Sequence, residues 1–122
     1  RDFTYVDDIV ESIARLVPKA PKPDSTWSGL APDPASSFAP YRVYNIGNNK
    51  PVELLKFIEI IEQEIGKPAI KNFLPMQDGD VPETYADVTD LMREINFEPA
   101  TPIEVGVANF VNWYKEYYNI KQ

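Results

Sequence analysis

The chain has 122 residues, and its apolar (43%) and charged (25%) fractions are typical of a globular protein. Its formal net charge of −7 argues against a nucleic-acid-binding surface, because neutralising phosphates needs clustered cations and the twelve Lys and Arg are dispersed. It lacks cysteine and histidine, which excludes disulfides, thiolate chemistry, zinc sites and serine–histidine triads. With short apolar runs and no signal peptide, we expect one domain over 1–122, located in the cytoplasm and without a membrane partner.

The first elements predicted are a short strand and an amphipathic helix. Residues 3–6 are aromatic and β-branched, which favours a strand, and Asp7 is placed to cap a helix that ends at Pro18. The chain starts on Arg1 with no initiator Met and runs directly into these elements, so it reads as the middle of a longer protein.

A Pro-rich loop is expected over 18–40, because Pro, Ser, Ala and Asp dominate this stretch. Its 23 residues exceed the usual length of a connection, which indicates a mobile surface excursion. Trp27 and Phe38 offer an alternative, in which they anchor the loop or contact a partner subunit.

The middle of the chain predicts a strand over 41–46, a turn at 47–49 and a helix with Pro51 in its first turn. Apolar residues then recur at helical spacing as far as Ile65, and Gly66 and Pro68 end the helix. Residues 69–74 form a third short apolar segment, a candidate strand.

Two helices are predicted in the last third. Asp87 is placed to cap the first, which contains Leu91 and Ile95. Thr101 and Glu104 have the spacing of a capping box for the second, with Pro102 at the first helical position. The apolar stripe of this last helix consists of Ile103, Val107, Phe110, Val111, Tyr114 and Tyr118.

Three strand candidates separated by helices predict an α/β fold with a small mixed sheet. A sheet of so few strands leaves an edge or a face open, which usually means a missing neighbour or a partner chain.

Several motifs together resemble one enzyme family. They are RDFTYVDD at 1–8, YNIGN at 44–48, PMQDGDVP at 75–82 and the last helix from Pro102 to Tyr114. The chain resembles the C-terminal part of the NAD-dependent nucleotide-sugar epimerases, extended members of the short-chain dehydrogenase/reductase superfamily, and is most like the UDP-glucuronate 4-epimerases. The resemblance implies the C-terminal substrate-binding domain without the Rossmann half, and UDP-sugar as the ligand.

The catalytic parts of that family are not expected in this chain. A dinucleotide-binding turn needs clustered glycines, and none of the five glycines lies within three residues of another. Tyr117 and Lys121 have the i, i+4 spacing of the family's catalytic pair, but the resemblance places that pair upstream of Arg1, so we interpret the match as chance. NAD is therefore expected in the parent enzyme and not in this chain, which we predict to be inactive alone.

Three residues are candidates for substrate binding. The resemblance implies that Arg1 reaches the nucleotide diphosphate, which a guanidinium fork matches in a bidentate way, although a terminal arginine can equally be untethered. It implies that Asp80 accepts hydrogen bonds from the ribose hydroxyls, the alternative being an aspartate that satisfies its own turn. Gln77 occupies the stretch where galactose-type epimerases carry an arginine, a departure that favours the glucuronate type.

Two other interpretations stay open. Asp7, Asp8 and Glu11 could form a metal cluster, but capping and the helix dipole explain their position better. The chain could also be a stand-alone binding or dimerisation module, a homodimer held by surfaces that a Rossmann half would cover, or part of a nucleotide-sugar dehydratase or decarboxylase.

Overall fold

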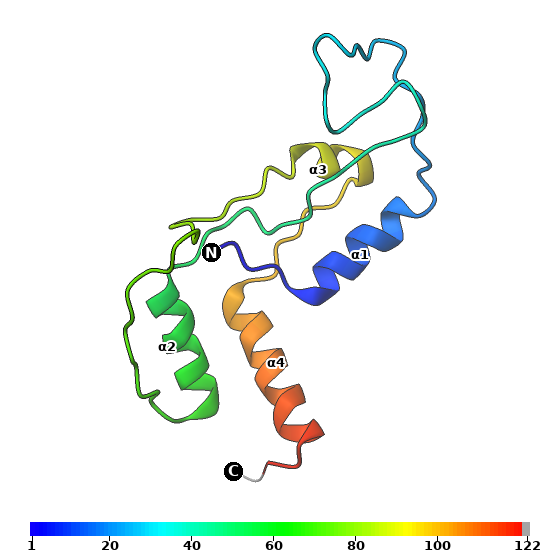
Figure 1. Cartoon of the computed structure of the whole chain (residues 1–122). Coiled ribbons are helices and arrows are strands. Elements are labelled where there is room, and N and C mark those ends of the chain that lie inside the picture. The colour runs from blue at the N-terminus through cyan, green and yellow to red at the C-terminus, as the bar shows by residue number, and fades with distance from the viewer. Residues whose placement is uncertain (121–122) are drawn as a thin grey trace.

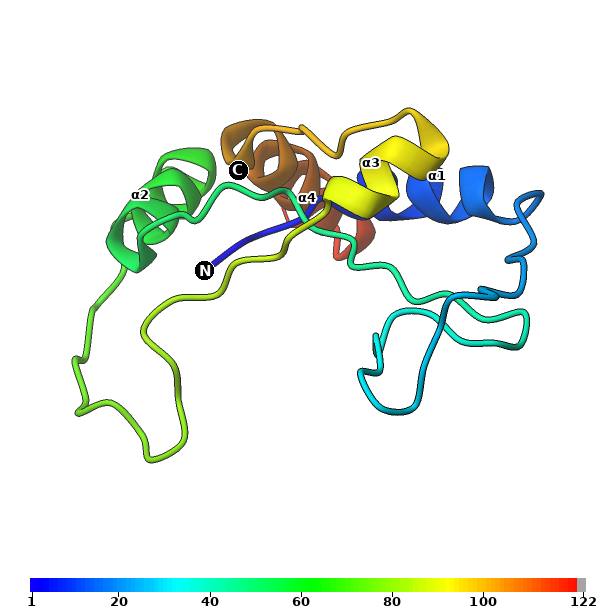
Figure 2. The same ribbon diagram turned by 90° about the horizontal axis from the view of Figure 1, so that it is seen from above.

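The computed structural model describes residues 1–120. Four helices form within this range, α1 (Val6–Leu16), α2 (Leu54–Ile65), α3 (Thr89–Ile95) and α4 (Ile103–Tyr117). Helix α2 packs beside α4, and α1 packs beside α3, so the molecule consists of two helix pairs (Figure 1). Figure 2 views the molecule from above. In this view, long connecting segments lie between the helix pairs and in the lower part of the picture.

The two helices of the first half differ from expectation at their starts. Helix α1 begins at Val6 with Tyr5 as its N-cap, so the predicted cap by Asp7 is wrong. Helix α2 begins at Leu54, so the prediction that Pro51 lies in its first turn is wrong as well. The reason is that Val52 exchanges backbone hydrogen bonds with Arg1, at 2.9 and 2.8 Å, which holds this stretch extended.

The predicted end of α2 is confirmed. Gly66 adopts a left-handed conformation with φ 77°, and its N–H donates to the carbonyl of Glu62 at 2.9 Å. Glycine takes this conformation without a Cβ penalty, which explains why the helix stops there.

The two helices of the last third form as predicted, with different caps. The Asp87 carboxylate accepts a hydrogen bond from the N–H of Thr89 at 3.0 Å, one residue outside the N-cap Val88. The predicted capping box at α4 is wrong, because the N-cap is Pro102 and makes no side-chain cap. Instead the N–H of Thr101 donates to the Asp8 carboxylate at 2.9 Å, which ties the start of α4 to α1.

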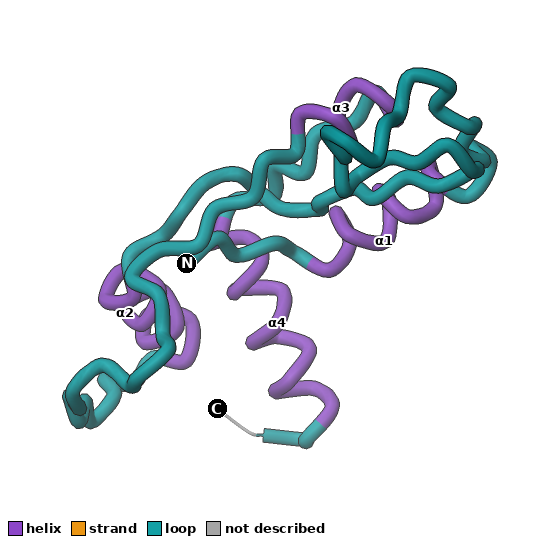
Figure 3. The backbone as a smooth tube through the Cα atoms, turned by 45° about the horizontal axis from the view of Figure 1, so that its top comes forward, coloured by secondary structure: helices purple, strands orange, loops and turns teal. Residues whose placement is uncertain are grey.

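The small mixed sheet is not formed within residues 1–120, where only two isolated bridges occur, Asp2 with Pro51 and Ser36 with Arg42. Figure 3 accordingly draws the connecting segments as loops throughout. Pro51 has no N–H to continue a ladder beyond its bridge. The segment 69–74 is exposed along its whole length, so it has no neighbour to pair with.

The core between α2 and α4 is small. Ile60, Val107 and Val111 are buried, with Phe57 and Ile61 packed against them. The accessible surface is 9456 Å², whereas folded monomers of this mass expose about 6,700 Å². The molecule thus exposes more surface than a compact monomer of its mass, and this surface includes large apolar side chains such as Val10 and Phe110.

The Pro-rich loop is held by its own side chains. The rings of Trp27 and Phe38 lie 5.6 Å apart, and the indole Nε1 of Trp27 donates to the carbonyl of Asp33 at 3.1 Å. The two aromatic residues thus anchor the loop internally, which was one of the two alternatives.

Within residues 1–120, none of the helices combines the length and the apolar character that a membrane span requires.

Candidate functional site

The side chain of Arg1 reaches across 79 positions of sequence to form an ion pair with Asp80. A second terminal nitrogen of the guanidinium donates to the carbonyl of Val81 at 2.7 Å. The backbone of Arg1 is held as well, through its two hydrogen bonds with Val52. Arg1 is therefore tied at both its backbone and its side chain, and does not behave as an untethered end.

The segment 77–81 forms the other side of this site. The N–H of Asp80 donates to the carbonyl of Gln77 at 3.1 Å, and Gly79 inside this turn has φ 86°, a conformation that favours glycine. The N–H of Val81 donates to Asp80 Oδ1 at 2.9 Å, the same oxygen that faces Arg1. The structure thus brings Arg1, Gln77 and Asp80 together, with Gln77 contributing its backbone carbonyl to the turn.

Asp2 organises this region and was not predicted. Its carboxylate accepts hydrogen bonds from the N–H groups of Asn49 and Lys50, at 3.1 and 3.4 Å, and its own N–H donates to the Thr84 hydroxyl at 3.1 Å. A Cβ at Gly47 would lie 2.9 Å from this carboxylate, so only glycine leaves it room. Two features of the sequence could have indicated this role: the acidic residue beside Arg1, and a Gly-Asn-Asn turn whose backbone N–H groups need hydrogen-bond acceptors.

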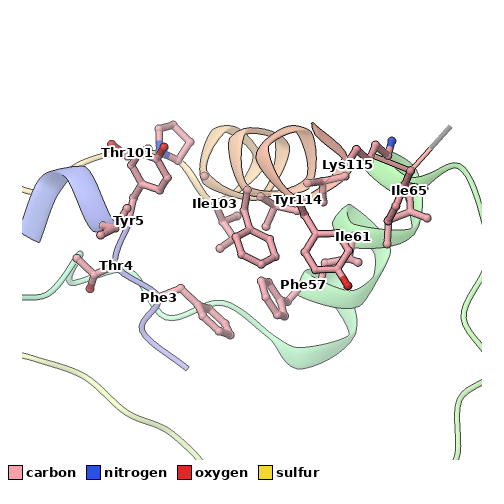
Figure 4. Close-up of a pocket in the computed structure, with 17 residues that line it drawn as sticks. Phe3, Thr4, Tyr5, Phe57, Ile61, Ile65, Thr101, Ile103, Tyr114 and Lys115 are labelled. Carbon is pink, nitrogen blue, oxygen red and sulfur yellow. The ribbon is translucent and has the colours of Figure 1, made fainter. Parts of the chain in front are cut away.

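A second feature is an apolar groove of about 630 Å³ between α2, α4 and the N-terminal segment. Figure 4 shows Phe3 and Phe57 facing each other at one side of it; their rings stack with centroids 4.2 Å apart. Within residues 1–120, the charged side chain on its wall is Lys115, whose Nζ donates to the carbonyl of Glu64 at 2.9 Å. Apolar side chains make up most of the lining of this groove, so it suits an apolar surface.

The site at Arg1 combines a cation with a carboxylate and backbone groups. A guanidinium matches phosphate oxygens, and a carboxylate accepts hydrogen bonds from vicinal hydroxyls, so the pair can recognise a sugar phosphate. Both side chains are partly solvated, with exposed fractions of 37% and 48%. The arrangement can bind and orient such a ligand.

The other candidate groups have structural roles. Among residues 1–120 no cluster of acidic side chains could hold a metal ion. Asp8 receives the N–H of Thr101, and Glu11 pairs with Arg15 one turn later. Tyr117 stacks on Trp113, at 5.3 Å between ring centroids, while Lys121, the second member of the Tyr–Lys match, lies outside the described residues.

Several curated relatives of the chain are UDP-glucuronate 4-epimerases. The chain is 63% identical to Protein CapI of Staphylococcus aureus over 97% of its length, and 48% identical to a probable UDP-glucuronate 4-epimerase of Rhizobium meliloti, also over 97%. It is 40% identical to UDP-glucuronate 4-epimerase 1 of Arabidopsis thaliana. The chain spans 35%, 35% and 27% of these three proteins, about a third of their length. No protein-family model matches it.

Solved structures give the same result. Over 97% of the chain, the fold matches UDP-glucuronic acid 4-epimerase of Bacillus cereus, in complex with UDP-4-deoxy-4-fluoro-glucuronic acid and NAD, with a TM-score of 0.71 and 25% identity. It also matches the enzyme WbmF of Bordetella bronchiseptica in complex with NADH, at 19% identity and a TM-score of 0.69, over 30% of that protein. The resemblance predicted from the sequence, to the C-terminal part of a nucleotide-sugar epimerase with an α/β fold, is confirmed by these relatives.

Proposed function

We propose that this chain is the substrate-binding part of a NAD-dependent UDP-glucuronate 4-epimerase, and that it contributes contacts to UDP without being catalytic alone. Arg1 binds the diphosphate and Asp80 accepts hydrogen bonds from the ribose hydroxyls. The observation that carries the proposal is the convergence of Arg1 and Asp80, distant in sequence, in a chain about half identical to a probable epimerase.

The parent enzyme uses NAD, which removes a hydride from C4 of the sugar and returns it to the other face. The Bacillus cereus neighbour was crystallised with NAD and a UDP-sugar, which supports this cofactor and this ligand class. The chain described here supplies orientation for the nucleotide, while the glycine turn and the Tyr–Lys pair belong to the rest of the parent protein. A nucleotide-sugar dehydratase or decarboxylase is the alternative within the same family.

We further propose that the extended segments 3–5, 41–46 and 69–74 complete a mixed sheet only beside the remainder of the parent enzyme. The excess of accessible surface supports this, because it exceeds the roughly 800 Å² that one partner contributes to a standard interface. Alone, the chain uses the same apolar surfaces to form a homodimer, which is the stand-alone alternative. The location proposed is the cytoplasm.

The test of UDP binding is calorimetry of the chain with UDP-glucuronate, UDP and NAD. We expect UDP and UDP-glucuronate to bind, and NAD to give no heat of binding. Asp80→Ala should weaken UDP binding by roughly 1–3 kcal/mol, the cost of losing a hydrogen bond to a charged group. Asp78→Ala removes the same charge two residues away and is the control. Equal affinity of the two variants would reduce Asp80 to a turn residue, and binding of NAD would overturn the division of roles.

A further inference from the structure

The ion pair between Arg1 and Asp80 has a consequence for ligand choice. Both terminal nitrogens of the guanidinium donate to the segment 80–81, one to the Asp80 carboxylate and one to the Val81 carbonyl. This is the edge of the guanidinium that forms two parallel hydrogen bonds with a phosphate. The groups that would bind an anion thus already form hydrogen bonds with the protein, and a carboxylate neutralises the positive charge.

We infer that Asp80 is a specificity-determining residue, which makes Arg1 respond to nucleoside diphosphates and not to free phosphate or pyrophosphate. The inference rests on the proposed function. An anion without a ribose must compete with the Asp80 carboxylate for Arg1 and gains nothing from displacing it. A nucleoside diphosphate brings two vicinal hydroxyls, which donate to the carboxylate and compensate it for the loss of Arg1. Recognition of the ribose and of the diphosphate is thereby coupled through one ion pair.

The geometry of the loop supports this exchange. Asp80 Oδ1 already accepts the N–H of Val81 at 2.9 Å, so the carboxylate keeps a protein partner when Arg1 leaves. Gly79, in the turn before it, lies in open space, with no heavy atom within 4 Å of where a Cβ would be. The segment therefore has room to adjust as a ligand enters, while Asp2 and Val52 keep the backbone beside Arg1 fixed.

The test compares inorganic pyrophosphate with UDP, using the whole chain. Asp80→Asn removes the charge and keeps the shape and one acceptor. We expect pyrophosphate to bind this variant about threefold to fivefold more tightly than it binds the unsubstituted chain. This factor corresponds to the free energy of a half-exposed ion pair. UDP should bind it about tenfold more weakly, because a carboxylate accepts hydrogen bonds from hydroxyls better than an amide does.

Asp78→Asn is the matched control, because it makes the same change of charge in the same loop and Asp78 forms no ion pair within residues 1–120. An increase in pyrophosphate affinity of the same size in both variants would mean only a general change in potential, and would overturn the inference. Unchanged pyrophosphate affinity in Asp80→Asn would overturn it too. If the unsubstituted chain failed to bind UDP, this would instead contradict the proposed function, even if Asp80→Asn gained affinity for pyrophosphate. Amide spectra of each variant verify that it is folded.

Discussion

At the scale of single residues, charged side chains in this chain fasten distant segments. Arg1 joins Asp80, Asp2 joins the turn at 49–50, and Asp8 joins Thr101. None of these contacts is deeply buried, so each contributes little to the free energy of folding. Each one instead holds two distant segments of the chain in a fixed relative position. The ion pair of Arg1 with Asp80 holds together the two segments that supply the proposed nucleotide contacts.

The turn at Asp24 should respond to acid. The Thr26 hydroxyl and then the Thr26 N–H hydrogen-bond to its carboxylate and lower the pKa of Asp24 below its ordinary value of 3.8. Because the folded pKa is depressed, this stabilisation is present above about pH 4 and is lost as the pH falls through the folded value. In a Trp113→Phe background, Trp27 fluorescence should change with a midpoint below 3.8. A midpoint above that value, or the same titration in Asp24→Asn, would contradict this account.

Sequence reasoning proposed Arg1, Gln77 and Asp80 as substrate contacts through their motifs, and did not single out Asp2. The first three lie in strings that carry a family pattern, whereas the bonds of Asp2 depend on the Gly47 turn folding back against the start of the chain. The pairing of Arg1 with Asp80 was also not predicted. The motifs predict a different part of the nucleotide for each residue, the diphosphate for Arg1 and the ribose for Asp80, and nothing local indicates that the two side chains pair with each other.

At the scale of elements, helices were predictable and strands were not. Each of the four helices carries its own apolar periodicity and start or stop signals, so its hydrogen bonds are local. A strand forms only beside another strand, and the start of this chain makes a single isolated bridge, between Asp2 and Pro51, which has no N–H to continue a ladder. The capping box of Thr101 failed for a related reason, because the N–H of Thr101 is taken by Asp8 from another element.

The packing of α2 on α4 should contribute strongly to the stability of the chain. Ile60 is 2% exposed and belongs to the small core with Val107 and Val111. Ile60→Ala should lower the free energy of unfolding by about 2–5 kcal/mol, since it leaves a cavity. Leu54→Ala lies in the same helix at a position that is 63% exposed, and should cost less than about 1 kcal/mol. Urea unfolding measures both values, and equal losses would mean that this core is not formed.

At the scale of the whole molecule, the surface is too large for the mass. The chain exposes apolar side chains on α1, on α4 and around the groove of Figure 4. It spans about a third of the length of its relatives, in which the remaining two thirds are available to cover such surfaces. Without that cover, self-association is the expected outcome.

Self-association should depend on the groove. Phe110 lines it and is 58% exposed, so Phe110→Asp should shift the chain from dimer to monomer in sedimentation equilibrium. Val10 on α1 is equally exposed at 58% but lies away from the groove, so Val10→Asp should leave the dimer intact. Dissociation of the dimer by Val10→Asp and not by Phe110→Asp would place the interface on α1. If the unsubstituted chain is a monomer, the homodimer is no longer part of the proposal.

The central claim is that nucleotide recognition is built into this chain by the segments around Arg1 and Asp80. The most direct measurement is an NMR titration of the labelled chain with UDP-glucuronate. The account predicts saturable amide shifts confined to residues 78–85 and to the N-terminal segment, and their loss in Asp80→Ala. A well-dispersed spectrum that stays unchanged, or shifts centred on the groove between α2 and α4, would contradict it.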